Sequence, residues 1–390
     1  MEKERISSVQ LFLLLIGFLI GSTVILHPTS TVKNDAWMAI ILGCAGGALL
    51  MMVYVAIALL NPSRTLVEIL KDRLGKFVGT AVSILYIWYF IHLASLVFRN
   101  YGEFITTATF PETPMVVVIG LFAVILVYAI NSGIEIMARL CELFVPVIPA
   151  VFLIISLSLI KVTDFTAFLP ILENGIAPVL KAAVSFATFP FGETIAFLMV
   201  FPHLNKKEDL KKTVSMSLLF KLVLSLLIFF RDSSVLGADL MDRATFETHM
   251  TALLIPGLNV EPLVDINLLI GGGVKISICL YAAVKALSQV LGINDYRDLT
   301  TAVATFSVVL SIWIYENILE MFRWVDKIWH FYSLSFQVII PLLLLFLSLK
   351  KRKEPSKDGL KAKQQRNRRL HLSPHYKNNL KGKTNIDKKH

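Results

Sequence analysis

Apolar residues recur along the chain in ten long stretches that are separated by short polar segments. A helix needs roughly 17 to 25 predominantly apolar residues to cross a membrane, and the stretches lack the alternation that is typical of barrel strands. The pattern therefore predicts an all-α integral membrane protein with ten transmembrane helices. The predicted spans are residues 9–27, 36–60, 79–100, 114–131, 142–160, 178–200, 213–231, 265–290, 299–315 and 331–349.

Two of these spans contain helix breakers at corresponding places. The first is interrupted in residues 17–23 and the sixth in residues 188–193, and they open two halves at about 6–160 and 178–349. Each half holds five spans, so the second half begins on the opposite side of the membrane. In transporters with such inverted repeats, broken helices form a small-molecule site near the middle of the bilayer. We therefore expect a 5+5 inverted repeat with broken helices 1 and 6.

Composition agrees with a membrane protein and separates the tail from the rest of the chain. Hydrophobic residues make up 55% of the 390 residues and charged residues only 17%, whereas soluble domains carry about 25% charge. Residues 350–390 hold 15 Lys and Arg against three acids, so the net charge of +10 resides in the tail. We expect residues 1–349 to form the membrane domain and 350–390 to be a basic, disordered tail near anionic lipid. Nucleic acid is not an expected partner, because no folded reader module accompanies the tail.

Loop charges predict the orientation in the membrane. Ten spans place both termini on one side, and Lys and Arg are concentrated after span 2, after span 6 and in the tail. Because positive loops stay in the cytoplasm, both termini are predicted to be cytoplasmic. The opposite loop at 232–264 is acidic and contains a predicted surface helix at 246–254. Residues 316–330 are expected to form either a helix in the membrane interface or a plain connecting helix.

No metal, cofactor or catalytic motif is indicated by the sequence. Cys44, Cys141 and Cys279 lie in apolar spans without the spacing of a metal site or a disulfide framework. Nucleotide-binding loops and the motifs of metalloproteases and serine hydrolases are missing as well. We therefore expect a protein that binds no cofactor and is not an enzyme.

The two broken spans resemble those of a known transporter superfamily. Residues 17–23 resemble the glycine-broken first helix of the amino acid–polyamine–organocation (APC) superfamily, and residues 186–193 resemble its broken sixth helix. Here Gly192 and Glu193 are adjacent, whereas the superfamily pattern spaces the glycine and the acid. The resemblance implies an APC/LeuT-like fold.

From Ile6 to Leu349 the chain also resembles the B subunits of bacterial endospore germinant receptors. The shared features are the ten spans, a basic loop that begins at Phe201-Pro202 after span 6, and Arg231 followed by Val235-Leu236-Gly237. Residues 270–275 in span 8 are richer in glycine than is typical of that family.

This second resemblance implies a subunit of a nutrient germinant receptor in the spore inner membrane. It would act with an A-type subunit and a C-type lipoprotein, and would sense an amino acid or another small nutrient. Two other functions stay open: a proton-coupled amino acid permease, and a scaffold or channel-like subunit whose pocket is vestigial.

The candidate ligand residues lie at the helix breaks. An unwound helix exposes backbone N–H and C=O groups, which can bind the carboxylate and the ammonium of an amino acid. For Gly17 and Gly21 the alternative is close helix packing, because their spacing is that of a small-xxx-small interface. The residues concerned are Gly17, Gly21, Ser22, Thr23, Thr188, Phe189, Pro190 and Gly192.

Two charged residues are predicted near the middle of the membrane, where an unpaired charge costs about 2.5 to 3.5 kcal/mol on insertion scales. Glu193 could bind a substrate ammonium, carry a coupling proton or hold the freed backbone of the broken helix. Lys275 is about ten residues, or roughly 15 Å, into span 8. It could serve proton coupling or form a structural ion pair with Glu193.

Aromatic residues of span 3 complete the candidates. Tyr86 and His92 could line the pocket that faces span 1, although a lone membrane histidine also serves as a packing residue. Phe98 and Tyr101 could gate ligand entry, or belong to the ordinary belt of aromatic residues at a membrane interface.

Overall fold

The computed structural model describes residues 4–21, 30–161, 171–243, 246–255, 257 and 259–353. Two predicted ligand residues, Ser22 and Thr23, and the basic tail beyond Lys353 lie outside the described residues. By its internal contacts the chain divides into residues 1–345 and 346–390, and the contacts discussed below lie within the first unit.

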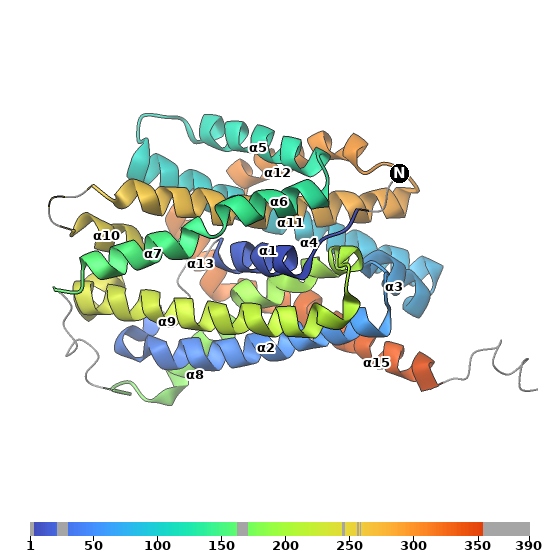
Figure 1. Cartoon of the computed structure of the whole chain (residues 1–390), viewed down its shortest axis with the longest axis horizontal. Helices are drawn as coiled ribbons and strands as arrows, with labels where there is room; N and C mark the ends of the chain where they lie inside the picture. Colours follow the sequence, from blue (N-terminus) through green and yellow to red (C-terminus); the bar gives the residue numbers. More distant parts are fainter. Residues whose placement is uncertain are drawn as a thin grey trace, which may run out of the picture. The chain divides into compact units, whose positions relative to one another are not determined.

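Every regular element in these ranges is helical (Figure 1). The α-helices are α1 (Ser8–Ile20), α2 (Ala36–Leu60), α3 (Leu66–Leu74), α4 (Lys76–Phe104), α5 (Met115–Asn131), α6 (Ile134–Phe144), α7 (Val147–Ser158), α8 (Ile176–Phe186), α9 (Leu210–Arg243), α10 (Glu247–Leu253), α11 (Glu261–Leu291), α12 (Arg297–Trp313), α13 (Ile318–Lys327), α14 (Trp329–Leu334) and α15 (Ile340–Lys353). Shorter 3₁₀ or π-helical segments are η1 (Ser30–Asp35), η2 (Ile105–Thr109), η4 (Ala187–Phe191), η5 (Gly192–Met199), η6 (Phe201–His203), η7 (Lys207–Asp209) and η8 (Ser335–Ile339).

Each predicted span overlaps one or more helices among the described residues, although residues 22–27 of the first span lie outside them. Among the described residues, seven helical stretches are long and apolar enough to cross a membrane, and an eighth consists of α12 and α13, which are bent by 99° at the break between them. Two shorter apolar helices, α1 and α5, lie where the first and fourth spans are predicted. The predicted helix at 246–254 is present as α10, and the segment predicted at 316–330 contains α13.

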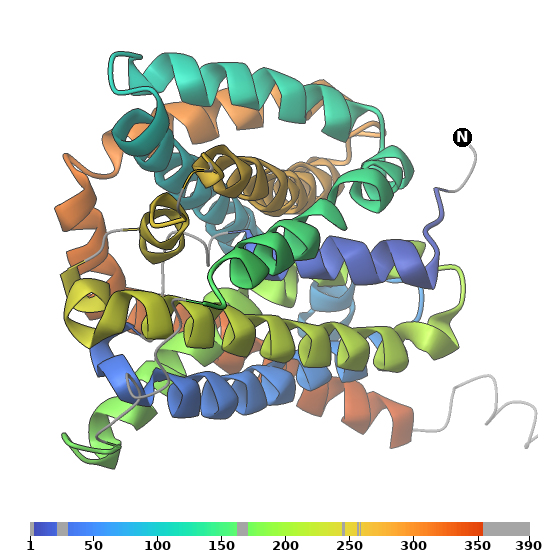
Figure 2. The same ribbon diagram turned by 60° about the vertical axis from the view of Figure 1, so that its left-hand side comes forward.

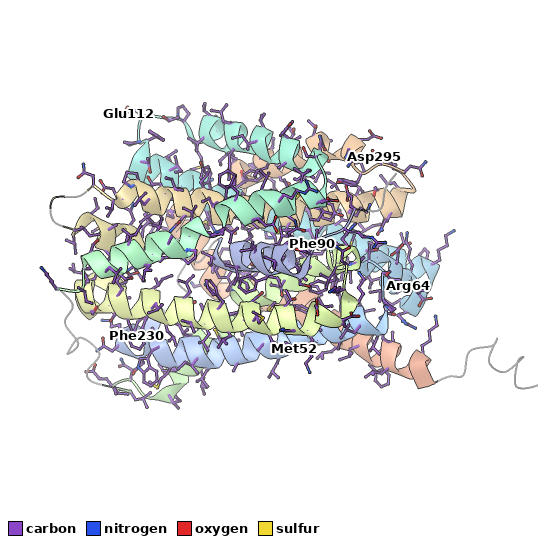
Figure 3. All side chains as sticks on the ribbon, viewed as in Figure 1. Met52, Arg64, Phe90, Glu112, Phe230 and Asp295 are labelled. Carbon is purple, nitrogen blue, oxygen red and sulfur yellow. The ribbon has the colours of Figure 1, made fainter. Side chains whose placement is uncertain are left out.

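Exposed side chains fit a membrane environment. Figure 3 shows Arg64 and Asp295 toward one end of the helices and Glu112 toward the other, while Phe90 lies among them. Large apolar side chains are exposed on the flanks of the helices, for example Leu219 on α9. This is the distribution expected of helices whose flanks face lipid and whose ends face water.

Glycines let α1 approach α11 closely, and α11 also packs against α4, α5 and α12 (Figure 2). A Cβ atom at Gly21 would overlap the backbone carbonyl of Gly271, and one at Gly17 would lie 3.0 Å from Val274. The glycine-rich stretch of span 8 therefore has a packing role, because it provides the surface on which α1 rests.

At the N-terminal end of α1, the chain ties several elements together. Ile6 pairs with the segment after η6, since its N–H donates to His203 O (2.9 Å) and its carbonyl accepts from Asn205 N–H (3.0 Å). Glu4 lies 3.3 Å from Arg297 at the start of α12. Ile6 is fully buried, so these contacts close this end of the helix bundle.

At the opposite end, buried polar side chains connect α9 to α10. Arg231 pairs with Asp232 at 2.7 Å, and the Thr248 hydroxyl donates to the second oxygen of Asp232 (2.8 Å). α9 is interrupted at Gly237, whose φ of +70° is accessible to glycine with little strain. Burial and the nearby charge of Asp232 raise the pKa of the Glu247 carboxyl from its usual 4.5 to about 8.

Glu247→Gln is expected to remove a pH-dependent contribution to stability. A carboxyl whose pKa is higher in the folded protein stabilises the fold fully below about pH 4.5, and this contribution is lost as the pH rises to about 8. Thermal unfolding of the full-length chain at pH 5 and pH 8 should therefore show a smaller pH effect in the variant. Glu112→Gln, in an exposed loop, is the control, and an unchanged pH effect in Glu247→Gln would contradict the prediction.

Candidate ligand-binding site

The sixth span is broken where the sequence predicts. α8 ends at Phe186, and within η4 the backbone of Phe189 is extended (φ −128°, ψ 113°) before the tightly wound segment η5 begins. Pro190 explains this locally, because proline has no N–H to donate and also pushes the preceding residue out of the helical region. The regular α-helical hydrogen bonding of α8 thus gives way to a π-helical segment and then to a 3₁₀ segment. The Thr188 hydroxyl lies within hydrogen-bond distance of Val184 O (3.1 Å) and Ser185 O (3.0 Å), both at the end of α8.

Tyrosine side chains from two other helices bind backbone carbonyls at the break and in the neighbouring segment η8. The Tyr54 hydroxyl on α2 lies within hydrogen-bond distance of Gly192 O (3.0 Å) and Gln337 O (2.7 Å), and the Tyr86 hydroxyl on α4 donates to Phe336 O (2.7 Å). The Phe336 and Gln337 carbonyls belong to η8, a π-helical segment of the kind that often occurs at functional sites. A Cβ at Gly192 would overlap the Gln337 side-chain amide, so any larger residue there would displace that amide.

Tyr54→Phe is expected to lower the free energy of unfolding by about 1–3 kcal/mol, because it leaves buried carbonyls of Gly192 and Gln337 without this donor. Urea or thermal unfolding of the full-length protein in detergent measures the loss. Tyr128→Phe on α5 is the matched control, since the Tyr128 side chain is exposed. Equal stabilities of the two variants would show that the Tyr54 hydroxyl does not support the break.

Lys275 and Glu193, predicted from the sequence as proton or ion-pair candidates, lie together. The Lys275 ammonium on α11 is 2.5 Å from Glu193 Oε2 at the start of η5, and the side chains are 0% and 2% exposed. The ammonium also lies 4.4 Å from the centre of the Phe189 ring, within the range of a cation–π interaction. Neither charged atom has an additional hydrogen-bond partner in the described part of the chain.

The Lys275–Glu193 pair has no net charge, but both side chains keep unused hydrogen-bonding capacity. An ammonium can donate three hydrogen bonds and a carboxylate oxygen can accept more than one, yet the contacts above leave part of that capacity unused. Removal of one partner from a buried pair leaves an uncompensated charge, which costs far more than loss of the whole pair. Lys275 and Glu193 can therefore bind a ligand in place of each other only if the ligand carries charges that compensate both side chains.

Of the other candidates, Gly21 lies next to the pair, because a Cβ atom there would be 2.9 Å from Lys275 Cβ, whereas His92 on α4 contacts other residues. Gly17 and Gly21 face α11, as the packing alternative expects. His92 stacks on Trp88 (5.8 Å between ring centres) and meets Trp324 edge-on (5.5 Å), so it belongs to an aromatic cluster beside α13 and α14.

Tyr86, Phe98 and Tyr101 also make packing contacts. The Tyr86 ring meets Phe336 of η8 at 5.5 Å. Phe98 and Tyr101 both contact Phe122 on α5, with ring centres 6.4 and 4.3 Å apart. These contacts join α4 to its neighbours.

The sequence reasoning missed four buried polar residues. Tyr54 and Gln337 support the broken span, as described above. Lys221 on α9 is 2% exposed, with its ammonium 5.8 Å from the centre of the Phe186 ring. Asn100 on α4 is 3% exposed. The available signal was a polar or charged residue inside an apolar span, which is costly and therefore points to a specific role.

The sequence matches a known family over most of its length. Residues 5–320 match the family described as spore germination protein. Spore germination protein KB of Bacillus subtilis (strain 168) is 34% identical over 373 residues, which cover 92% of this chain and 98% of that protein. Spore germination protein B2 of the same organism is 20% identical, covering 89% of this chain and 96% of that protein.

Solved structures with a similar fold are transporters. Mhp1, a nucleobase-cation-symport-1 family transporter in a closed conformation with bromovinylhydantoin bound, has a TM-score of 0.67 at 12% identity and covers 91% of this chain and 81% of its own. MhsT in complex with L-phenylalanine has a TM-score of 0.62 at 12% identity, with coverage of 89% and 100%. The chain therefore belongs to the spore germination protein family, among the B subunits of germinant receptors, and has the fold of LeuT-type transporters.

Proposed function

We propose that this chain is the membrane-embedded, ligand-binding subunit of a nutrient germinant receptor, and that it binds an amino acid at the broken sixth span. The observation that carries the proposal is the buried Lys275–Glu193 pair beside the extended backbone at Phe189. Family membership supports a role in germination, and the LeuT-type fold supports a small-molecule site within the membrane.

The charge balance of the pair favours a zwitterion as the ligand. An amino acid can place its ammonium against Glu193 and its carboxylate against Lys275, so that one buried ion pair becomes two and the interior stays neutral. A ligand with only a positive or only a negative charge would leave one side chain uncompensated, which is costly away from water. Ligand binding would thus separate Lys275 from Glu193 and shift α11 relative to η5.

The family and the loop charges support a proposed assembly and location. The receptor would lie in the spore inner membrane with both termini in the cytoplasm, and would include an A-type subunit and a C-type lipoprotein. On the opposite side, segment 232–264, with Met250 and Leu253 of α10 exposed, and the amphipathic helix α13 would face such partners. The basic tail would lie near anionic lipid.

A paired experiment tests this function. Proteoliposomes that contain this chain alone are assayed for uptake of radiolabelled amino acids, and spores that lack the chain are assayed for nutrient-triggered germination. We expect no concentrative uptake, a loss of the germination response, and rescue by the wild-type chain but not by Glu193→Gln. Glu112→Gln, which changes an exposed loop, should rescue fully.

The second candidate function is a proton-coupled amino acid permease. It is favoured by a buried carboxylate in a fold whose solved examples are transporters, because such a group can carry a coupling proton. Concentrative uptake driven by a pH gradient, together with normal germination of the deletion spores, would establish the permease and refute the receptor.

A further inference from the structure

A narrow crevice lies beside Glu193. Its walls come from α4, from the broken sixth span and from the α13–α14 turn, with Asn100, Phe189, Glu193, Met321 and Trp329 among the lining residues. The cavity measures about 20 Å³, which is enough for roughly one water molecule. Because Glu193 lines it, the crevice adjoins the proposed amino acid site.

Two side chains in this crevice carry unused hydrogen-bonding atoms. Asn100 is 3% exposed and its Oδ1 has no hydrogen-bond partner among the described residues; Trp329 is 2% exposed and the same holds for its Nε1. The first atom accepts a hydrogen bond and the second donates one. Buried polar atoms are usually satisfied in native proteins, so an acceptor and a donor that line one cavity form a site for a small polar group.

The Trp329 indole is held in position by its neighbours. Its ring centre lies 6.5 Å from that of Tyr89 and 6.0 Å from that of Trp324. The remaining lining is largely apolar, with Phe189 and Met321 buried beside it. A mostly apolar cavity with a few fixed polar groups is the usual construction of a site that selects among small molecules.

From these observations we infer that the crevice receives and selects a hydroxyl group on the side chain of the bound amino acid. A hydroxyl has the size of the water molecule that the cavity can hold, donates one hydrogen bond to Asn100 Oδ1 and accepts one from Trp329 Nε1. An aliphatic side chain of the same shape would leave both atoms unpaired. This inference rests on the proposed function, since it assigns the side-chain subsite of the same amino acid site.

Isosteric ligands provide the test. The full-length chain in lipid nanodiscs is titrated with L-threonine and with L-valine, which differ by a hydroxyl in place of a methyl group. We expect threonine to bind roughly 10-fold or more tightly than valine. Asn100→Leu and Trp329→Phe should each reduce that preference while valine affinity is retained. Trp313→Phe, at an 85% exposed tryptophan on α12, should leave the preference unchanged.

The possible outcomes separate the inference from the function on which it rests. Equal affinity of the wild-type chain for threonine and valine would overturn the hydroxyl subsite, with the crevice then holding water only, while the amino acid site would stand. A full preference in both Asn100→Leu and Trp329→Phe would also overturn it. Binding of neither amino acid, nor of L-serine and L-alanine, by the wild-type chain would refute both the subsite and the proposed amino acid site. Thermal unfolding midpoints of the variants exclude misfolding as the cause.

Discussion

Lys275→Met is expected to lower the free energy of unfolding by about 3–5 kcal/mol, because it leaves the Glu193 carboxylate buried without its counter-charge. Methionine is unbranched and adaptable, so it can occupy much of the space of the lysine stem. The loss of stability then reports the removal of the ammonium charge. The measurement is thermal or denaturant unfolding of the full-length protein in detergent micelles. Part of the loss is avoided if Glu193 takes up a proton, so the effect should be larger at alkaline than at acidic pH.

A double-mutant cycle isolates the pair from other effects. Glu193→Leu alone should also destabilise the protein, whereas Lys275→Met combined with Glu193→Leu should recover most of the loss because no charge then remains unpaired. Lys211→Met, at an exposed position on α9, should change stability by no more than about 0.5 kcal/mol. If the two single losses simply add in the double variant, Lys275 and Glu193 are not energetically coupled.

The same double variant separates the structural role of the pair from ligand binding. A protein with Lys275→Met and Glu193→Leu should fold, since an apolar replacement of a buried ion pair is often neutral or stabilising. It should nevertheless fail to restore nutrient-triggered germination, because neither charge of a zwitterion would find a partner. We therefore expect this variant to keep its stability and to lose the nutrient response.

Local chemistry explains why the broken sixth span could be predicted. Pro190 cannot donate a backbone hydrogen bond and restricts Phe189, so the interruption is a property of adjacent residues. The Lys275–Glu193 contact was one of two alternatives for Lys275, and it follows from the need of a membrane-embedded charge for a partner. Helix positions were also predictable, because length and apolar character alone define a span.

Contacts between distant residues could not be predicted. Tyr54 and Gln337 are 283 positions apart, and nothing in either local sequence says that the hydroxyl reaches that carbonyl. The direction in which His92 points also depends on the path of α13 and α14, which bring Trp324 to its ring. Periodicity gives the existence of a helix but not the neighbour that each of its faces meets.

Glycines illustrate the same limit most directly. From the sequence alone, Gly21 could serve ligand binding or helix packing, and the run Gly271-Gly272-Gly273 had no explanation. In the structure the two features account for each other, because Gly271 is the residue whose backbone Gly21 contacts. A small residue on one helix is informative only once its partner on the other helix is known.

Gly21→Ala is accordingly expected to be strongly destabilising, by about 1–3 kcal/mol or more. The new methyl group would overlap the Gly271 carbonyl, and a backbone atom cannot move aside as the end of a side chain can. α1 would have to separate from α11, which carries Lys275, so the variant should also weaken the nutrient response. Thermal unfolding and germination of complemented spores measure the two effects.

Two other glycines serve as controls because the space around them differs. At Gly272 the nearest neighbour of a new Cβ would be Gly21 O at 3.7 Å, an ordinary contact, and at Gly120 on α5 there would be none within 4 Å. Gly272→Ala and Gly120→Ala should thus be tolerated, or stabilise slightly, since alanine favours a helix over glycine by about 1 kcal/mol. If Gly21→Ala were as stable as these two while germination was lost, close packing would not explain Gly21, and contact of its backbone with the ligand would.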